Sequence, residues 1–248
     1  MQYTARVPGA VVIVSDAHLG PDVSSEPFLR FLASVPDLGA HLVINGDLFD
    51  FWFEYGAVIP RRAFRVLSAL HRLVLQGIEV TVTGGNHDRW GGSFWREDVG
   101  ASFHREGAHL VLAGWRAAIL HGDGASETHV AARVMHRVTR WPATAAVFRW
   151  LHPDLGFWLV QRMSGRLAQQ TRHGHVLEQA AAAQAAWARA FLEREAAVDL
   201  LILGHTHRAA FEPVGEQRWY VNPGAWCEGE CYALVTEAGP ELRVFGRR

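Results

Sequence analysis

Short apolar runs recur along the chain, and each one stops at a glycine or a polar side chain. Runs of this kind, bounded by turn residues, are typical of buried strands; they lie at 11–14, 42–44, 78–82, 117–120 and 200–203. Segment 60–76 begins with a proline and carries apolar residues at helical spacing, namely Phe64, Leu67, Leu70 and Val74. Alternating strands and helices predict an α/β protein in which helices cover a buried sheet.

The stretch 125–175 interrupts this alternation. It contains no convincing strand, and its seven arginines against two acidic residues give it a net charge of +5, whereas the whole chain carries −1. Five aromatic residues lie among these arginines: Trp141, Phe148, Trp150, Phe157 and Trp158. We therefore expect one domain over residues 1–248, with a helical insertion at about 125–175 that caps the site as a lid. An alanine-rich helix is predicted at 176–195, with Ala180, Ala183, Trp187 and Phe191 facing the main sheet.

The composition is that of a globular protein and excludes several other classes. The 248 residues are 49% hydrophobic and 20% charged, which excludes a disordered or fibrous chain. Two cysteines are too few for a disulfide framework. The first apolar run lacks a basic segment before it and a cleavage site after it, so we expect no secretory signal and a cytoplasmic protein. A net charge of −1 gives no nucleic-acid footprint, so no nucleic-acid partner is expected.

Side chains that bind metals follow all five predicted strands. In α/β sheets, ligands bind beyond the carboxyl ends of the strands. The set combines carboxylates, imidazoles and an amide oxygen without thiolate, which suits Mn²⁺, Fe²⁺, Zn²⁺ or Mg²⁺. Seven donors exceed the need of one tetrahedral ion and suit two divalent ions about 3.5–4 Å apart. The candidates are Asp16, His18, Asp47, Asn86, His121, His205 and His207.

Each candidate alone has an ordinary explanation. A buried histidine is usually a hydrogen-bonded structural residue, and an aspartate after a strand, such as Asp16, is usually a helix N-cap. The joint pattern favours a metal centre, because the ordinary explanation would need five independent coincidences at five strand ends.

The blocks that hold these residues resemble the signature of the calcineurin-like metallophosphoesterases. In order, they are Asp16-Ala17-His18, Gly46-Asp47-Leu48-Phe49-Asp50, Gly85-Asn86-His87-Asp88, His121-Gly122-Asp123 and Gly204-His205-Thr206-His207. The resemblance implies a four-layer α/β/β/α sandwich and a dinuclear hydrolase of phosphoric esters or anhydrides. It would place one ion on Asp16, His18, Asp47 and His207. It would place the other on Asp47, Asn86, His121 and His205, with Asp47 bridging.

The same resemblance would put His87 near the leaving group, oriented by Asp88. Whether His87 acts as a general acid or has only a structural role is left open by the sequence. Asp50 is expected to anchor a ligand loop through a hydrogen bond rather than to bind metal itself.

Segment 46–55 is similar to that of the UDP-2,3-diacylglucosamine hydrolases of lipid A synthesis. This implies manganese and a lipid-linked nucleotide substrate that is cleaved to UMP and lipid X. Arginines and aromatic residues in the insertion suit a ligand that is anionic at one end and apolar at the other. Candidate phosphate contacts are Arg162, Arg166 and Arg172. An acyl groove lined by Trp52, Phe53, Trp141 and Trp158 is one reading of these aromatics, and simple packing is the other.

One residue departs from that group. Its best-known members have arginine where this chain has His87, so a soluble nucleotide, phosphodiester or phosphoprotein substrate remains the alternative. Segment 141–160 contains Arg149, Pro153 and Asp154, so it cannot cross a bilayer as a plain helix. Transient contact with the inner face of the cell membrane stays open.

Overall fold

The computed structural model describes residues 9–125, 137, 140–160, 162 and 174–246. Its first sheet has six strands in the order β11-β10-β1-β2-β3-β4. Strands β1 to β4 are parallel to one another. At one side β10 is antiparallel to β1, and β11 is antiparallel to β10. The strands are β1 (Val11–Val14), β2 (His41–Asn45), β3 (Glu79–Thr83), β4 (Ser102–His104), β10 (Cys231–Thr236) and β11 (Gly239–Val244).

The second sheet has five strands in the order β5-β6-β7-β9-β8. Its three central strands are parallel, and the outer strands β5 and β8 are antiparallel to their neighbours. The strands are β5 (Ala108–Leu112), β6 (Trp115–Ile119), β7 (Leu200–Ile202), β8 (Ala210–Pro213) and β9 (Trp219–Asn222).

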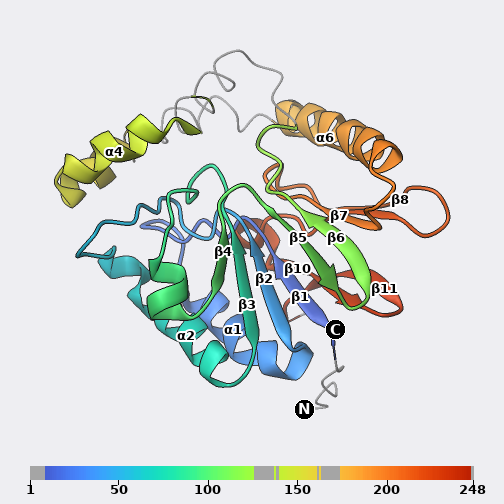
Figure 1. Ribbon diagram of the computed structural model, residues 1–248, viewed down its shortest axis with the longest axis horizontal. Coiled ribbons are helices and arrows are strands. Elements are labelled where there is room, and N and C mark those ends of the chain that lie inside the picture. Colours follow the sequence, from blue (N-terminus) through green and yellow to red (C-terminus); the bar gives the residue numbers. More distant parts are fainter. Residues whose placement is uncertain (1–8, 126–136, 138–139, 161, 163–173, 247–248) are drawn as a thin grey trace.

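Helices cover the outer face of each sheet (Figure 1). Helices α1 and α2 pack on the first sheet and α6 packs on the second, while α4 belongs to the insertion, where a further helical stretch covers 153–160. The helical elements are α1 (Glu26–Leu38), η1 (Arg61–Ala63), α2 (Phe64–Leu75), η2 (Trp95–Val99), α4 (Pro142–Trp150), α6 (Gly174–Arg194) and α7 (Trp226–Gly229).

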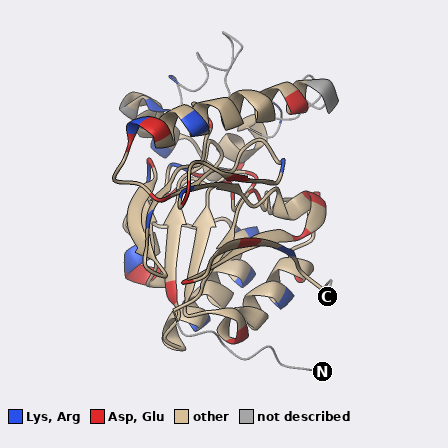
Figure 2. Cartoon of the chain, turned by 90° about the vertical axis from the view of Figure 1, so that its right-hand side faces the viewer, with Lys and Arg blue, Asp and Glu red and all other residues tan. Residues whose placement is uncertain are grey.

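Three apolar clusters fill the three interfaces between these layers. The first joins α1 and α2 to one face of the first sheet, as Phe31 and Leu70 pack with Val12. The second lies between the two sheets, where Ile13 and Val43 meet Ile202. The third joins α6 to the second sheet. In Figure 2 the strands are mostly tan, and charged residues lie mainly on helices and loops. The predicted four-layer α/β/β/α arrangement is therefore confirmed.

Several details differ from the sequence-based expectation. Phe64 is 62% exposed, because the buried face of α2 is formed by Val66, Leu67, Leu70 and their neighbours. The buried face of α6 is likewise rotated from the predicted one: it contains Gln184, Ala185, Ala188 and Leu192, with Trp187 and Phe191 at its border. This face packs on the second sheet.

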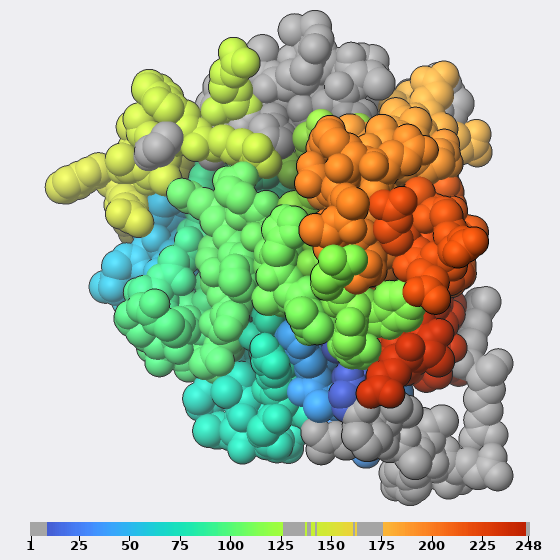
Figure 3. Space-filling model, turned by 45° about the vertical axis from the view of Figure 1, so that its right-hand side comes forward, coloured from blue at the N-terminus to red at the C-terminus, as the bar shows by residue number. Residues whose placement is uncertain are grey.

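The described part of segment 125–175 packs against the loops that follow β2 and β3. Phe148 of α4 contacts Phe51, Phe53 and Trp90, with ring centroids 5.4–6.0 Å apart, and Phe157 contacts Phe51 at 5.1 Å. In Figure 3 the residues of α4 (yellow-green) project from one end of the molecular surface. Among the described helices, none is long and apolar enough to cross a membrane.

Candidate metal centre

Loops from both sheets bring the strand-end residues together. Strands β1, β2 and β3 are parallel, as are β6 and β7, so in each sheet their carboxyl ends meet at one edge. Backbone hydrogen bonds join neighbouring loops: the Asp16 amide donates to the Gly46 carbonyl at 3.2 Å, and the Gly204 amide donates to the His121 carbonyl at 2.9 Å. The candidate ligands therefore converge from segments far apart in the sequence.

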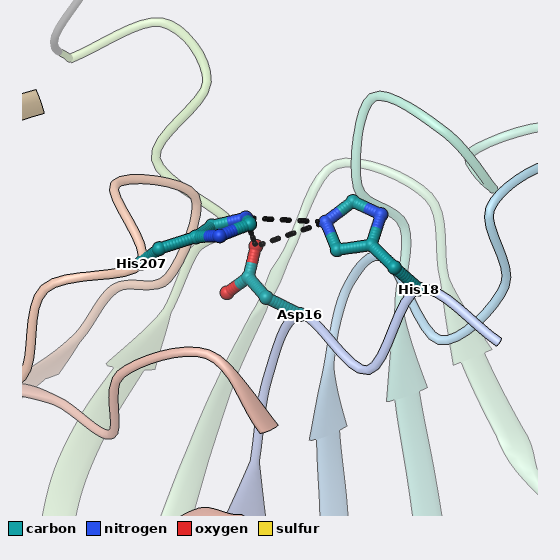
Figure 4. A group of neighbouring side chains, drawn as sticks. All are labelled: Asp16, His18 and His207. Carbon is teal, nitrogen blue, oxygen red and sulfur yellow. Dashed lines mark hydrogen bonds and ion pairs between the residues drawn. The ribbon is translucent and has the colours of Figure 1, made fainter. Parts of the chain in front are cut away.

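Asp16, His18 and His207 form the first group of candidate ligands (Figure 4). Nε2 of His18 lies 3.9 Å from Oδ1 of Asp16, and Nε2 of His207 lies 3.7 Å from the same oxygen. The two Nε2 atoms face each other at 3.2 Å. Because two nitrogen lone pairs repel, this contact requires a proton or a cation between the rings.

Asp47, His121 and His205 form the second group. Their ligand atoms all lie within 4.8 Å of one another. Oδ2 of Asp47 is 3.2 Å from Nε2 of His121, and the rings of His121 and His205 are 5.3 Å apart. Asn86 joins this group, because its Oδ1 lies 3.3 Å from Nε2 of His121.

Asp47 lies between the two groups. Its Oδ2 is 3.2 Å from Nε2 of His121 and 3.7 Å from Nε2 of His18. Two glycines make this close arrangement possible. A Cβ at Gly46 would lie 2.4 Å from the His121 ring, and one at Gly85 would lie 2.1 Å from Oδ1 of Asp47.

Backbone strain is concentrated at these positions. Among the described non-glycine residues, seven have positive φ, and five of the seven are candidate ligands. This conformation costs about 1–3 kcal/mol per residue and persists only where the surroundings hold it, which is typical of functional sites. The five are Asp16 (53°), His18 (43°), Asp47 (52°), His205 (69°) and His207 (59°).

Hydrogen bonds donated by Nδ1 fix the orientation of three histidines. Nδ1 of His121 lies 3.1 Å from the Asn45 carbonyl, Nδ1 of His87 lies 2.6 Å from the Asp50 carbonyl, and Nδ1 of His207 lies 2.7 Å from Oε1 of Glu228. These oxygens only accept, so Nδ1 carries the proton in each ring. Nε2 then faces the centre, as metal-binding histidines require.

The charges at the centre depend on one another. Burial lowers the pKa of His18 to about 3 and that of His205 to about 4, so both rings are neutral near pH 7. Burial alone would raise the pKa of Asp47, but His121, His87 and His18 hold it well below its usual value. Burial alone would lower the pKa of His121, but Asp47 and the other nearby carboxylates raise it well above its usual value. Without a cation, the charge of Asp47 is therefore balanced by a proton on His121.

Asp88 is hydrogen-bonded to the backbone of two loops. Its carboxylate accepts hydrogen bonds from the backbone amides of Gly85, Asp47 and Leu48, at 2.8–3.2 Å. It thus joins the loops after β2 and β3, whereas the His87 ring is oriented by the Asp50 carbonyl. Asp50 anchors the loop after β3 through its backbone oxygen, which accepts the hydrogen bond from Nδ1 of His87.

The predicted substrate residues lie mostly beyond what the structure describes. Arg162 is exposed, and its guanidinium lies 5.8 Å from the centroid of the Trp158 ring. Arg166 and Arg172 are outside the described residues. Trp52 and Phe53 are buried in aromatic packing, so the packing explanation holds for these two.

Sequence reasoning missed Glu228, the hydrogen-bond partner of His207. It lies in α7, after β9, and nothing in its local sequence marks it. Only the fold brings α7 next to β1, where the Trp226 amide donates to the Ser15 carbonyl.

The residues present fit a pair of divalent cations. Two groups of nitrogen and oxygen donors share one carboxylate between them, and the rings point Nε2 inward. A cation at this centre would also relieve the repulsion between the facing Nε2 atoms of His18 and His207. The donor set does not distinguish Mn²⁺ from Fe²⁺, Zn²⁺ or Mg²⁺.

Comparisons with known proteins identify the family of this chain. The family model for calcineurin-like phosphoesterases matches residues 9–209. A UDP-2,3-diacylglucosamine hydrolase from Porphyromonas gingivalis is 27% identical over 90% of this chain and 93% of its own, and one from Xanthomonas oryzae pv. oryzae is 29% identical over 94% and 98%. Among solved structures, that of wild-type Vps29 from Entamoeba histolytica, complexed with zinc, is 15% identical over 94% of this chain and 97% of its own, with a TM-score of 0.44. The family match over most of the chain shows that this protein belongs to the calcineurin-like phosphoesterases, a family of metal-dependent hydrolases.

Proposed function

We propose that the protein hydrolyses the diphosphate of UDP-2,3-diacylglucosamine to UMP and lipid X. The observation that carries this proposal is the similarity over 90% and more of the chain to relatives that bear this name. The Phe- and Trp-rich loop after β2 supports it, because the aromatic rings of the insertion pack on that loop.

In this proposal, Asp16, His18, Asp47 and His207 hold one cation. Asp47, Asn86, His121 and His205 hold the other. Bound there, the two cations would neutralise the phosphate charge and make hydroxide available near neutral pH. Manganese is the ion that we expect by analogy with the hydrolases.

His87 is proposed to act on the leaving group. Its Nδ1 donates to the Asp50 carbonyl, so Nε2 is the atom available to substrate. Burial alone would lower its pKa, but the Asp47 carboxylate and the Asp50 carbonyl raise it above the ordinary value. A proton held on Nε2 can therefore pass to the leaving oxygen. Asp88 is proposed to act by holding the loop that carries His87.

The insertion is proposed to bind the acyl chains and to touch the membrane surface as a lid. Its described part exposes large apolar side chains that a globular surface would otherwise bury: Trp141, Val147, Trp150, Leu155 and Trp158. Arg149 lies on α4 and Arg162 follows the helical stretch 153–160, and both supply positive charge for anionic head groups. Arg162, Arg166 and Arg172 are the proposed phosphate contacts.

A product assay tests the proposed activity. Purified protein with Mn²⁺ should release UMP from UDP-2,3-diacylglucosamine, measured by chromatography. Bis-p-nitrophenyl phosphate serves as the small reference substrate. Cleavage of the reference without UMP release at high enzyme concentration would favour the alternative, a soluble phosphodiester, nucleotide or phosphoprotein, which the histidine at position 87 also suits.

Changing Glu228 to glutamine should weaken metal binding. The substitution keeps the size of the side chain but removes the negative charge that holds the Nδ1 proton of His207. Loss of such a partner typically costs about 10–100-fold in metal affinity. Isothermal titration with Mn²⁺ measures the change. Glu230→Gln, two residues away, is the matched control, and an equal loss in that variant would contradict the role of Glu228.

Changing Trp150 to alanine should reduce binding to lipid vesicles. Trp150 is 92% exposed, and transfer of an aromatic side chain from water into an apolar phase contributes about 1.5–3 kcal/mol. We expect a loss of at least about tenfold in partition to vesicles that contain anionic lipid, measured by sedimentation. Leu75→Ala removes an exposed apolar side chain from α2, outside the insertion. Equal losses in both variants would argue against a specific membrane face on the insertion.

A further inference from the structure

Gln184 is a buried polar residue on an otherwise apolar helix face. It lies in α6, its side chain is fully buried, and its neighbours on that face are Ala185, Ala188 and Leu192. A carboxamide in such a place is unfavourable unless its donor and acceptor are both paired. A leucine at this position would be sufficient for helix packing, so the carboxamide of Gln184 has a further role.

The Gln184 carboxamide binds directly to the loop that carries His205 and His207. Its Nε2 donates to the Gly204 carbonyl at 2.9 Å, and its Oε1 accepts from the Thr206 hydroxyl at 3.1 Å. Gly204 and Thr206 alternate with the two histidines in the sequence. Gly204 and Thr206 are therefore hydrogen-bonded to α6, while the two histidines that alternate with them face the centre.

Strand β9 completes this buried network. The Tyr220 hydroxyl and the Asn222 amide donate to Oε1 of Gln184 at 2.9 and 3.0 Å. Asn222 also donates to the Gly204 carbonyl at 3.0 Å. Thr206, Tyr220 and Asn222 are at most 2% exposed, so water does not compete for these bonds. The loop is held from two sides, by α6 and by β9.

Gln184 also lies against the loop that carries His121. Gly122 has a φ of 101°, and a Cβ there would lie 2.5 Å from Nε2 of Gln184. The Gly204 amide in turn donates to the His121 carbonyl. One side chain thus borders both loops that provide the histidines of the second sheet.

We infer that Gln184 is a positioning residue that holds His205 and His207 ready for metal. Both histidines have left-handed backbone, a conformation that the surroundings must enforce. The bonds on either side of them, at Gly204 and Thr206, provide this constraint before any cation arrives. The inference rests on the metal ligands of the proposed function, but not on the identity of the substrate.

Metal titration of variants tests this role. Gln184→Met removes both hydrogen-bonding groups with little change in length, and Thr206→Val removes only the hydroxyl on the loop. We expect each to raise the Kd for Mn²⁺ by about 10–100-fold in isothermal titration of the full chain, as is typical when a residue that supports a ligand is lost. The visible absorption spectrum of the Co²⁺-loaded protein should change in both, because it reports the arrangement of the ligands.

Two control variants separate positioning from general stability. Ala188→Gly loosens the same helix in the same interface without touching the loop, and Gln179→Met makes the same chemical change at an exposed site of α6. Both should keep the wild-type Kd within about twofold, a difference of no more than about 0.4 kcal/mol, even where Ala188→Gly lowers the melting temperature.

The inference is overturned if Gln184→Met binds Mn²⁺ like the wild type, or if Ala188→Gly loses as much affinity. If Gln184→Met does not fold, Thr206→Val takes its place: wild-type affinity for Mn²⁺ in Thr206→Val, or an equal loss in Ala188→Gly, would overturn the inference. A wild type that binds no divalent ion would overturn both the inference and the metal centre. A wild type that binds metal but releases no UMP would overturn only the proposed substrate.

Discussion

Replacing Asp47 by alanine is expected to abolish hydrolysis of every phosphate substrate. Its carboxylate is the group that faces both His18 and His121, so its loss removes a donor from each proposed ion position. Such ions stabilise the transition state by several kcal/mol, so turnover should fall by at least about 10³-fold. Turnover of bis-p-nitrophenyl phosphate and bound metal per chain are the measurements. Both should fall together.

Folding of the Asp47 variant must be checked separately. The apolar clusters between the layers do not include Asp47, so the circular dichroism spectrum should stay close to that of the wild type. Asp37→Ala, at an acidic position in α1 away from the centre, is the matched control and should retain full activity. A folded Asp47→Ala protein with near-normal turnover would contradict the bridging position.

Most of the site could be predicted from the residues at the ends of the strands. A buried strand must stop where its apolar run stops, so Asp16, Asp47 and His121 were placed at sheet edges without a structure. Parallel pairing then predicted that they meet, and the structure brings them together. The sequence therefore predicts the position of a site residue where that residue directly follows its own strand.

Partners contributed by distant elements were not predictable in this way. Glu228 and Gln184 lie on helices, and their sequence context is that of an ordinary surface turn and an alanine-rich helix. The periodicity of α6 is weak because alanine is tolerated on every face, so the predicted buried face missed Gln184. The strand pattern alone did not separate two sheets, which only the family resemblance implied, because the edge strands β5 and β8 are short and carry exposed residues at alternate positions.

Metal affinity is expected to rise steeply with pH. In the metal-free protein, burial alone would lower the pKa of His121, but Asp47, Asp16 and Asp123 raise it well above the usual value of 6.5. His121 therefore carries a proton on Nε2 near pH 7, and a cation must displace it. Release of one proton per binding event raises affinity by about tenfold per pH unit as long as His121 is protonated in the metal-free protein.

The sign of this effect follows from the raised pKa of His121. Below the raised pKa of His121 the affinity climbs with pH, and above it the curve flattens. The rings of His18 and His205, with pKa values of about 3 and 4, are neutral throughout this range and release no proton. Titrations in two buffers of different ionisation enthalpy give the number of protons released, which should be close to one at pH 7. If no proton is released and the affinity does not change with pH, the centre carries no displaceable proton before the cation binds. That result would contradict the proposal that protonated His121 balances the charge of Asp47.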